Sequence, residues 1–210
     1  MTHTNHTLIF EACVETLDDA LVAQARGANR IELCSALDQD GLTPSPELTM
    51  QCVHQLSVPV MAMVRTRGGN FVYSESEIKQ MELDIEFFKQ SGVAGVVFGL
   101  LTKEGTIDIK NTRRLAKLAS PLEVTFHKAI DYSVDVYKSF KELNAIEGVT
   151  RVLTSGGEDI AWNGREILKQ MQEMQGRKIK IIAAGKVTPE NCTQIAEFTG
   201  VAELHGKRIM

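Results

Sequence analysis

Short runs of aliphatic and β-branched residues alternate with helix-period segments along the whole chain. Eight strand-like runs cover residues 8–14, 30–34, 58–65, 95–100, 123–130, 151–155, 180–184 and 202–205. Seven segments of helical periodicity lie between them, at residues 15–25, 46–56, 76–90, 109–119, 135–146, 164–174 and 189–198. This alternation is typical of βαβ units, whose parallel strands form one sheet.

Signals for helix ends support the same division. A capping residue followed by proline and glutamate predicts helix starts at Ser45–Pro46–Glu47 and at Thr188–Pro189–Glu190. A glycine follows five of the helical segments, at positions 27, 92, 148, 176 and 200. Glycine there is expected to form a left-handed C-terminal cap.

Eight repeats in 210 residues predict an α/β fold of the TIM-like (β/α)8 type. A chain of this length can bury one sizeable core, so residues 1–210 are expected to form a single domain. A doubly wound open sheet is the alternative. That fold usually carries GxGxxG after its first strand, where this chain reads CVETLDD.

The last strand ends near His205, which leaves no room for an eighth helix. We therefore expect a barrel that lacks this helix. Outward residues of the first and last strands, Leu8, Phe10, Ala202 and Leu204, then need another cover. A homodimer or larger homo-oligomer would supply one. A monomer whose rearranged terminus closes the gap is the alternative.

Charge and hydropathy exclude several classes of partner. A net charge of -4 and a pI near 5.8 come without a basic stripe, which argues against nucleic acid and anionic membranes. The chain start lacks a basic n-region, and no apolar run has the roughly 18 residues of a membrane span. We expect a cytoplasmic protein. In that compartment its four cysteines are expected to be free thiols or metal ligands.

Polar residues gather at the predicted ends of the strands. Counting with period two, the inward set comprises Glu11, Cys13, Glu32, Cys34, Arg65, Arg67, His127, Asp131, Thr154, Ser155, Glu203 and His205. Ionisable groups inside a barrel must pair or bind a ligand, because their desolvation is costly. Internal ion pairs, such as Arg30 with Glu11, are one explanation; a catalytic rim is the other.

His127 and His205 are candidates for acid–base chemistry or for metal ligation. The carboxylates of Glu11, Glu32 and Glu203 are expected in the same barrel mouth, so they complete a candidate catalytic set. Imidazole and carboxylate together could also hold Zn or Mn. The chain has no H-x-x-E or H-x-H spacing to support such a site.

Two cysteines end adjacent predicted strands. Cys13 and Cys34 could approach each other at the rim, and paired thiolates suit Cu(I). Simple packing is the alternative, since buried free cysteines often behave as small apolar residues. Cys52 and Cys192 fall within amphipathic helices, where packing is expected.

Glycine-rich loops with cations follow four strands and suggest an anion site. Arg65 and Arg67 precede a glycine pair and could grip a carboxylate or phosphate. Backbone amides and cations are also expected at Thr154, Ser155, Gly156, Gly185, Lys186 and Gly206. Ordinary turn chemistry is the alternative for each glycine.

The chain resembles the CutC family, whose name comes from copper homeostasis. The resemblance runs through EAC, GANRIELC, DGLTPS, VRTRGGNF, YSESE, GVVFGLL, TFHKAID, RVLTSGG and ELHGK. It implies a TIM-barrel-like fold, a cytoplasmic location, oligomers and copper binding, with Cys13 and Cys34 at the matching ligand positions. The chain departs from the family pattern at Asp40, Thr66, Asn70, Lys128 and Ala183–Gly185.

Two functional hypotheses follow. The first is copper homeostasis through Cu(I) bound by Cys13 and Cys34. The second is an enzyme that uses His and Glu as acid and base while Arg65, Arg67 and the glycine loops hold a small anionic substrate. Neither hypothesis predicts an organic cofactor.

Overall fold

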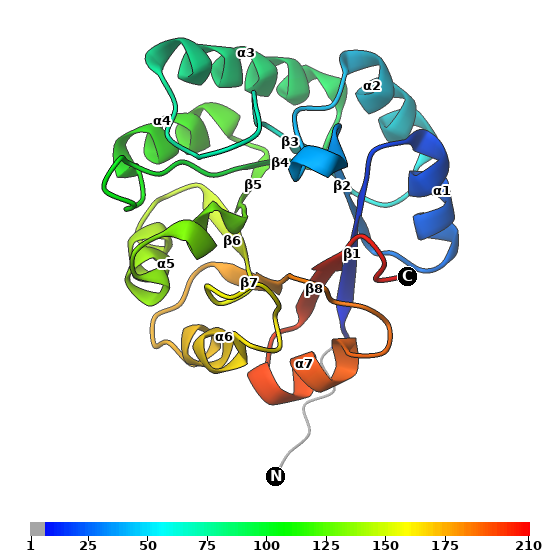
Figure 1. Cartoon of the computed structure of the whole chain (residues 1–210). Helices are drawn as coiled ribbons and strands as arrows, with labels where there is room; N and C mark the ends of the chain where they lie inside the picture. Colours follow the sequence, from blue (N-terminus) through cyan, green and yellow to red (C-terminus); the bar gives the residue numbers. More distant parts are fainter. Residues whose placement is uncertain (1–6) are drawn as a thin grey trace.

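The computed structural model describes residues 7–210 and contains a closed barrel of parallel strands (Figure 1). The strands are β1 (Ile9–Val14), β2 (Arg30–Leu33), β3 (Val60–Met63), β4 (Gly95–Phe98), β5 (Glu123–Phe126), β6 (Val149–Thr154), β7 (Lys180–Ala183) and β8 (Glu203–Gly206). Each pairs with the next, and β8 closes the ring by pairing with β1. The TIM-like barrel expected from the sequence is confirmed, and the open-sheet alternative is wrong.

Helices surround the barrel (Figure 1). They are α1 (Leu17–Ala25), α2 (Pro46–Gln55), α3 (Glu75–Ser91), α4 (Ile109–Ala119), α5 (Val136–Asn144), α6 (Arg165–Gln172) and α7 (Cys192–Thr199), with 3-10 helices η1 (Leu37–Gln39) and η2 (Lys128–Tyr132). Ser45 caps α2 as predicted. By contrast, α7 begins at Cys192. Residues 189–191 form a turn instead, across which the Thr188 carbonyl accepts hydrogen bonds from the Asn191 and Cys192 amides.

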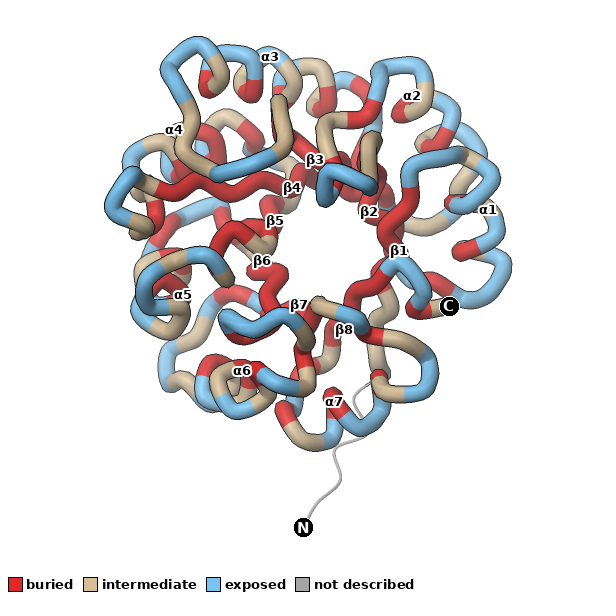
Figure 2. The backbone as a smooth tube through the Cα atoms, viewed as in Figure 1, coloured by how far each residue is buried: buried red, intermediate tan, exposed pale blue. Residues whose placement is uncertain are grey.

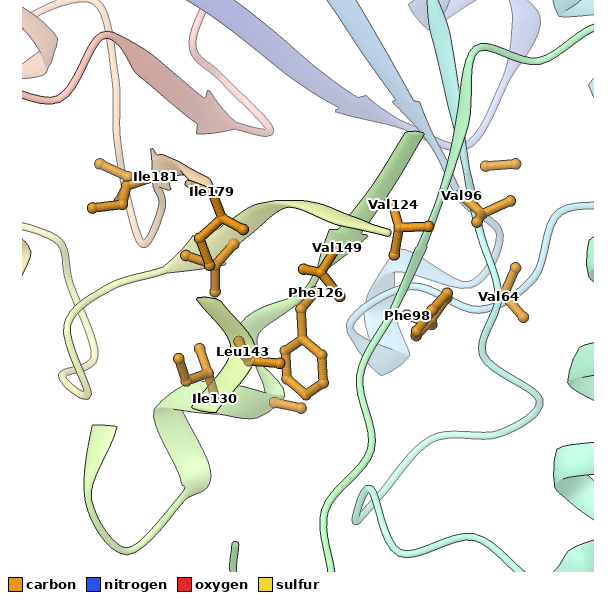
Figure 3. Packing of buried hydrophobic residues seen from close by; sticks show 14 of the residues in the cluster. Val64, Val96, Phe98, Val124, Phe126, Ile130, Leu143, Val149, Ile179 and Ile181 are labelled. Carbon is orange, nitrogen blue, oxygen red and sulfur yellow. The ribbon is translucent and has the colours of Figure 1, made fainter. Parts of the chain in front are cut away.

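The main core lies between the barrel wall and the helices. Strand residues such as Val96, Phe98, Val124 and Phe126 point outward into this layer (Figure 3). In Figure 2 the strands form a buried ring, while the outer faces of the helices are exposed. Because the aliphatic residues face the helices, the alternate strand residues must face the barrel axis.

The C-terminal tail covers part of the space that an eighth helix would fill. Figure 1 shows the C-terminus between α1 and α7. Ile209 is buried, and the Met210 carbonyl oxygen accepts a hydrogen bond from Arg26 Nη1 at 3.4 Å. Leu204 is fully buried within the single chain, while Leu8, Phe10 and Ala202 remain partly exposed. The expected absence of the eighth helix is confirmed across residues 7–210.

Candidate functional site

A cavity of about 160 Å³ opens at the carboxyl ends of the strands, the face where TIM barrels carry their active sites. Its lining comprises Cys13, Glu32, Leu37, Asp40, Met63, Arg65, Phe71, His127, Lys128, Ala129, Tyr132, Leu153, His205 and Lys207. The structure therefore brings together five of the residues predicted from sequence: Cys13, Glu32, Arg65, His127 and His205.

A pair of thiols forms one wall of the site. Cys13 lies near the end of β1 and Cys34 directly after β2, and their sulfur atoms are 3.9 Å apart, so they are free thiols in contact. The side chains of Met61, Met63 and Val97 pack around them. Cys34 is fully buried among these groups, while Cys13 also lines the cavity.

His205 lies between two carboxylates. Its Nδ1 is 2.8 Å from Oε1 of Glu11, and its Nε2 is 3.6 Å from Oε2 of Glu32. The pairing of β1 with β8 sets Glu11 opposite His205, so the closure of the barrel itself creates this contact. One ring nitrogen is held by Glu11, and the other faces the cavity.

Ligand atoms of Cys13, Glu32 and His205 all lie within 4.8 Å of one another. Cys34 adds a fourth potential ligand, since its sulfur lies 3.7 Å from Glu32 Oε2. The second carboxylate oxygen of Glu32 is buried without a hydrogen-bond partner among the described residues. Two thiols, an imidazole and a carboxylate form a donor set that fits a soft metal ion.

Without a metal, the site holds its protons tightly. The Cys34 thiol and burial hold the pKa of Cys13 well above its ordinary value. The hydrogen bond from Cys13 lowers the pKa of Cys34, but burial and Glu32 outweigh it and raise that pKa to about 11. Burial disfavours charge on His205, yet Glu32, Cys13 and Glu11 raise its pKa above the ordinary value. Metal ligation must therefore release protons.

An ion-pair network lies beneath the potential metal ligands. Arg30 donates to Glu11 and, at 2.6 Å, to Glu203, while Arg151 Nε donates to Glu203 at 3.0 Å. Burial opposes ionisation of Glu11, but His205 and Arg30 lower its pKa to about 2. Glu203 does not line the cavity, so its place is in the network that supports the site.

The carboxylate of Asp131 accepts hydrogen bonds from the amide groups that the sequence predicted would bind an external anion. This carboxylate accepts from the Thr154 hydroxyl, the Ser155 amide and hydroxyl, and the Gly157 amide. Lys128 Nζ lies 2.8 Å from the same carboxylate. Thr154, Ser155 and the Gly156–Gly157 turn are therefore engaged by the chain itself.

The other predicted anion-binding residues lie outside the lining of this cavity. Arg67 pairs with Glu77 at the start of α3 and donates to the Asn70 carbonyl. Gly185 accepts the Ala161 amide, Lys186 is exposed, and Gly206 packs against the Val187 backbone. The structure thus separates Arg65, which faces the mouth, from Arg67, which does not.

Sequence reasoning missed three features of the site: the methionine pair on β3, Phe71 and Tyr132. Met61 and Met63 share the parity of Arg65, so their position inside the barrel was readable from the strand pattern. Phe71 lies in a loop and Tyr132 ends the short helix η2, so no strand or helix periodicity in the sequence reports the direction of their side chains.

Comparison with known proteins agrees with the fold. Residues 8–210 match the CutC family. The chain is 38% identical to the human copper homeostasis protein cutC homolog over 197 residues, which span 94% of this chain and 72% of that protein. A CutC family protein of Mesorhizobium japonicum is 42% identical over 197 residues, 94% of this chain and 76% of its own length.

Solved structures extend the comparison. The putative copper homeostasis protein CutC from Streptococcus agalactiae has a TM-score of 0.90 at 33% identity and covers 97% of this chain and 100% of its own. A phosphonopyruvate hydrolase has a TM-score of 0.68 at 14% identity, and the match covers 96% of this chain and 76% of that one. At this identity the likeness shows the fold alone. Family match, sequence identity and barrel geometry lead to one conclusion: this chain belongs to the CutC family.

Proposed function

We propose that this protein binds Cu(I) through Cys13 and Cys34, with His205 and Glu32 beside them, and acts in copper homeostasis in the cytoplasm. The observation that carries the proposal is the pair of free thiols 3.9 Å apart in a buried cluster that also contains an imidazole nitrogen. Soft thiolates select Cu(I) over hard cations. The names of the human and Dictyostelium discoideum relatives, copper homeostasis protein cutC homolog, agree with this assignment.

An anaerobic Cu(I) titration against a chromogenic chelator tests the proposal. The wild-type protein should withdraw Cu(I) from the chelator, and the variant with Cys13→Ser and Cys34→Ser should not. The matched control carries Cys52→Ser and Cys192→Ser, which removes two buried cysteines in α2 and α7 and should leave binding unchanged. Equal binding by both double variants would refute the assignment. A parallel Zn²⁺ titration separates a soft-metal site from a general one.

We also infer that the protein forms a homo-oligomer through the side of the barrel without an outer helix. Leu8, Phe10 and Ala202 remain partly exposed there, and apolar groups of this kind are commonly covered by a second subunit. Light scattering with size-exclusion chromatography measures the mass directly. A monomer mass at micromolar concentration would contradict the inference.

None of the helices described over residues 7–210 is long and apolar enough to cross a membrane.

A further inference from the structure

Arg65 is a buried cation that has no acidic partner among the residues that the structure describes. It is 3% exposed, and Nη1 donates to the carbonyls of Gln39 and Gly41 while Nη2 donates to that of Gly69. Over residues 7–210, no carboxylate forms an ion pair with Arg65, and its Nε has no hydrogen-bond partner. A buried charge without a counter-charge is strongly destabilising. An anion that enters from outside would supply the missing charge.

His127 offers a second unused donor in the same cavity. Its Nδ1 accepts the Ala129 amide at 3.1 Å, which leaves the ring proton of the neutral form on Nε2. That Nε2 is buried and has no partner among the described residues. Burial and the nearby Arg65 charge lower the pKa of His127 to about 3, so the ring is neutral at physiological pH. His127 is therefore a neutral hydrogen-bond donor that needs an acceptor.

Phe71 joins the two donors. Its ring centroid is 4.9 Å from Arg65 Cζ and 5.1 Å from the centroid of the His127 ring. Arg65, Phe71, Asp40 and Tyr132 also line an adjoining cavity of about 510 Å³ beneath the loops after β3 and β4. The mouth thus combines unused donors, an aromatic wall and room for a small organic molecule.

We propose that the barrel mouth binds a small organic molecule bearing an oxyanion, either a carboxylate or a phosphate group. The oxyanion pairs with Arg65 and accepts a hydrogen bond from Nε2–H of His127, and the rest of the molecule lies along Phe71 and Tyr132. Glu32 and His205 border the same cavity, so the bound molecule lies next to the cluster of potential metal ligands. This site does not depend on copper, because neither Arg65 nor His127 belongs to that cluster.

Calorimetric titration of the metal-free protein with malonate and, separately, with glycerol phosphate tests the proposal and distinguishes the two oxyanions. At least one of them should bind saturably, and neutral malonamide should not. In a parallel NMR titration of ¹⁵N-labelled protein, the Nε2 resonance of His127 should shift, since a new hydrogen bond forms there. A failure of both probes to bind the folded wild-type protein would overturn the proposal.

Variants locate the site. Arg65→Gln and His127→Gln should each weaken binding about tenfold or more, because each removes or neutralises a donor to a charged group. Arg114→Gln is the matched control, since this arginine pairs with Glu75 and Glu82 away from the cavity and should leave binding unchanged. If the Arg65→Gln variant fails to fold, the His127→Gln variant alone tests the location of the site. Unchanged anion binding by folded His127→Gln protein would overturn this location. The Cys13→Ser, Cys34→Ser variant should retain anion binding, which separates this proposal from copper binding.

Discussion

Nδ1 of His205 lies 2.8 Å from Oε1 of Glu11 inside the barrel, and the strand pairing of β8 with β1 places the two residues side by side. A carboxylate in this position fixes the orientation of the ring and makes its other nitrogen a stronger ligand. Arg30 holds Glu11 from the other side. The ion-pair network beneath the cavity therefore orients the His205 ring, whose Nε2 faces the cavity.

Replacing Glu11 with glutamine should weaken Cu(I) binding about tenfold to a hundredfold, because a neutral amide polarises His205 less than a carboxylate does. Chelator competition measures the change. Glu123→Gln is the control, since Glu123 lies at the far end of the network, pairs with Arg151 and is partly exposed. Equal affinities in Glu11→Gln and the wild type would mean that Glu11 does not support a metal ligand.

Arg30→Met should lower the free energy of unfolding by about 3–5 kcal/mol, because it leaves the buried carboxylates of Glu11 and Glu203 without their shared cation. Urea denaturation measures this change. Arg114→Met removes a more exposed arginine that pairs with Glu75 and Glu82, and should lower the free energy of unfolding much less, because solvent screens these pairs. Similar losses in the two variants would contradict the assigned roles.

The free energy of unfolding should fall as the pH is lowered from 6.5 toward 3, in part because of His127. Its pKa is about 3 in the folded protein against about 6.5 for an unperturbed histidine, so the unfolded chain binds the proton first. The stabilisation that neutral His127 gives to the folded state is complete above pH 6.5. Between pH 6.5 and pH 3 it declines by up to about 1.4 kcal/mol per pH unit. His127→Gln should show a shallower dependence, and the difference between the two curves isolates this residue. Parallel curves would exclude a neutral buried His127.

Gly99→Ala should displace the His127 ring, because an added Cβ would overlap with Nδ1 and Cε1 of that ring. We expect a loss of about 1–3 kcal/mol in stability and a changed His127 resonance. Gly68→Ala is the control, since its Cβ would meet the flexible Gln39 side chain at 3.1 Å. An unshifted His127 resonance in Gly99→Ala would show that the ring has more freedom than its contacts indicate.

Asp131→Ala should create a site for inorganic phosphate. The change frees the Ser155 and Gly157 amides, which suit an anion once the carboxylate is gone. The variant should melt at a lower temperature than the wild type and recover part of the loss in millimolar phosphate. Wild-type protein should show no such gain from this position. Calorimetry with and without phosphate checks both statements, and a variant indifferent to phosphate would contradict them.

Strand parity accounts for most of what the sequence predicted correctly. The alternation of Arg30, Glu32 and Cys34 with Ile31 and Leu33 assigned each side chain to the inside or outside of the barrel. The explanation by internal ion pairs is confirmed for part of the set, and a catalytic role for the rest stays a prediction. Arg30 and Glu11 form the expected internal ion pair, while Glu32 and His205 reach the cavity.

Loop geometry accounts for what could not be predicted. Arg65 and Arg67 are two residues apart, but the strand ends at Met63 and periodicity no longer reports where their side chains point. The hydrogen bond from the Ser155 amide to Asp131 depends on η2, which follows β5, meeting the loop after β6, and the two residues are 24 positions apart in sequence. The start of α7 was misjudged because a proline also fits a turn that precedes a helix.

The carboxylate of Asp131 has a wider consequence for how the barrel exchanges molecules with its surroundings. Because it fills the rim above β6 from within, the cavities at this end are lined mainly by residues that follow β2, β3, β4, β5 and β8. An engineer who wishes to change which molecules enter the barrel would therefore vary residues 35–45, 66–73 and 99–106 and keep Asp131 and its partners unchanged.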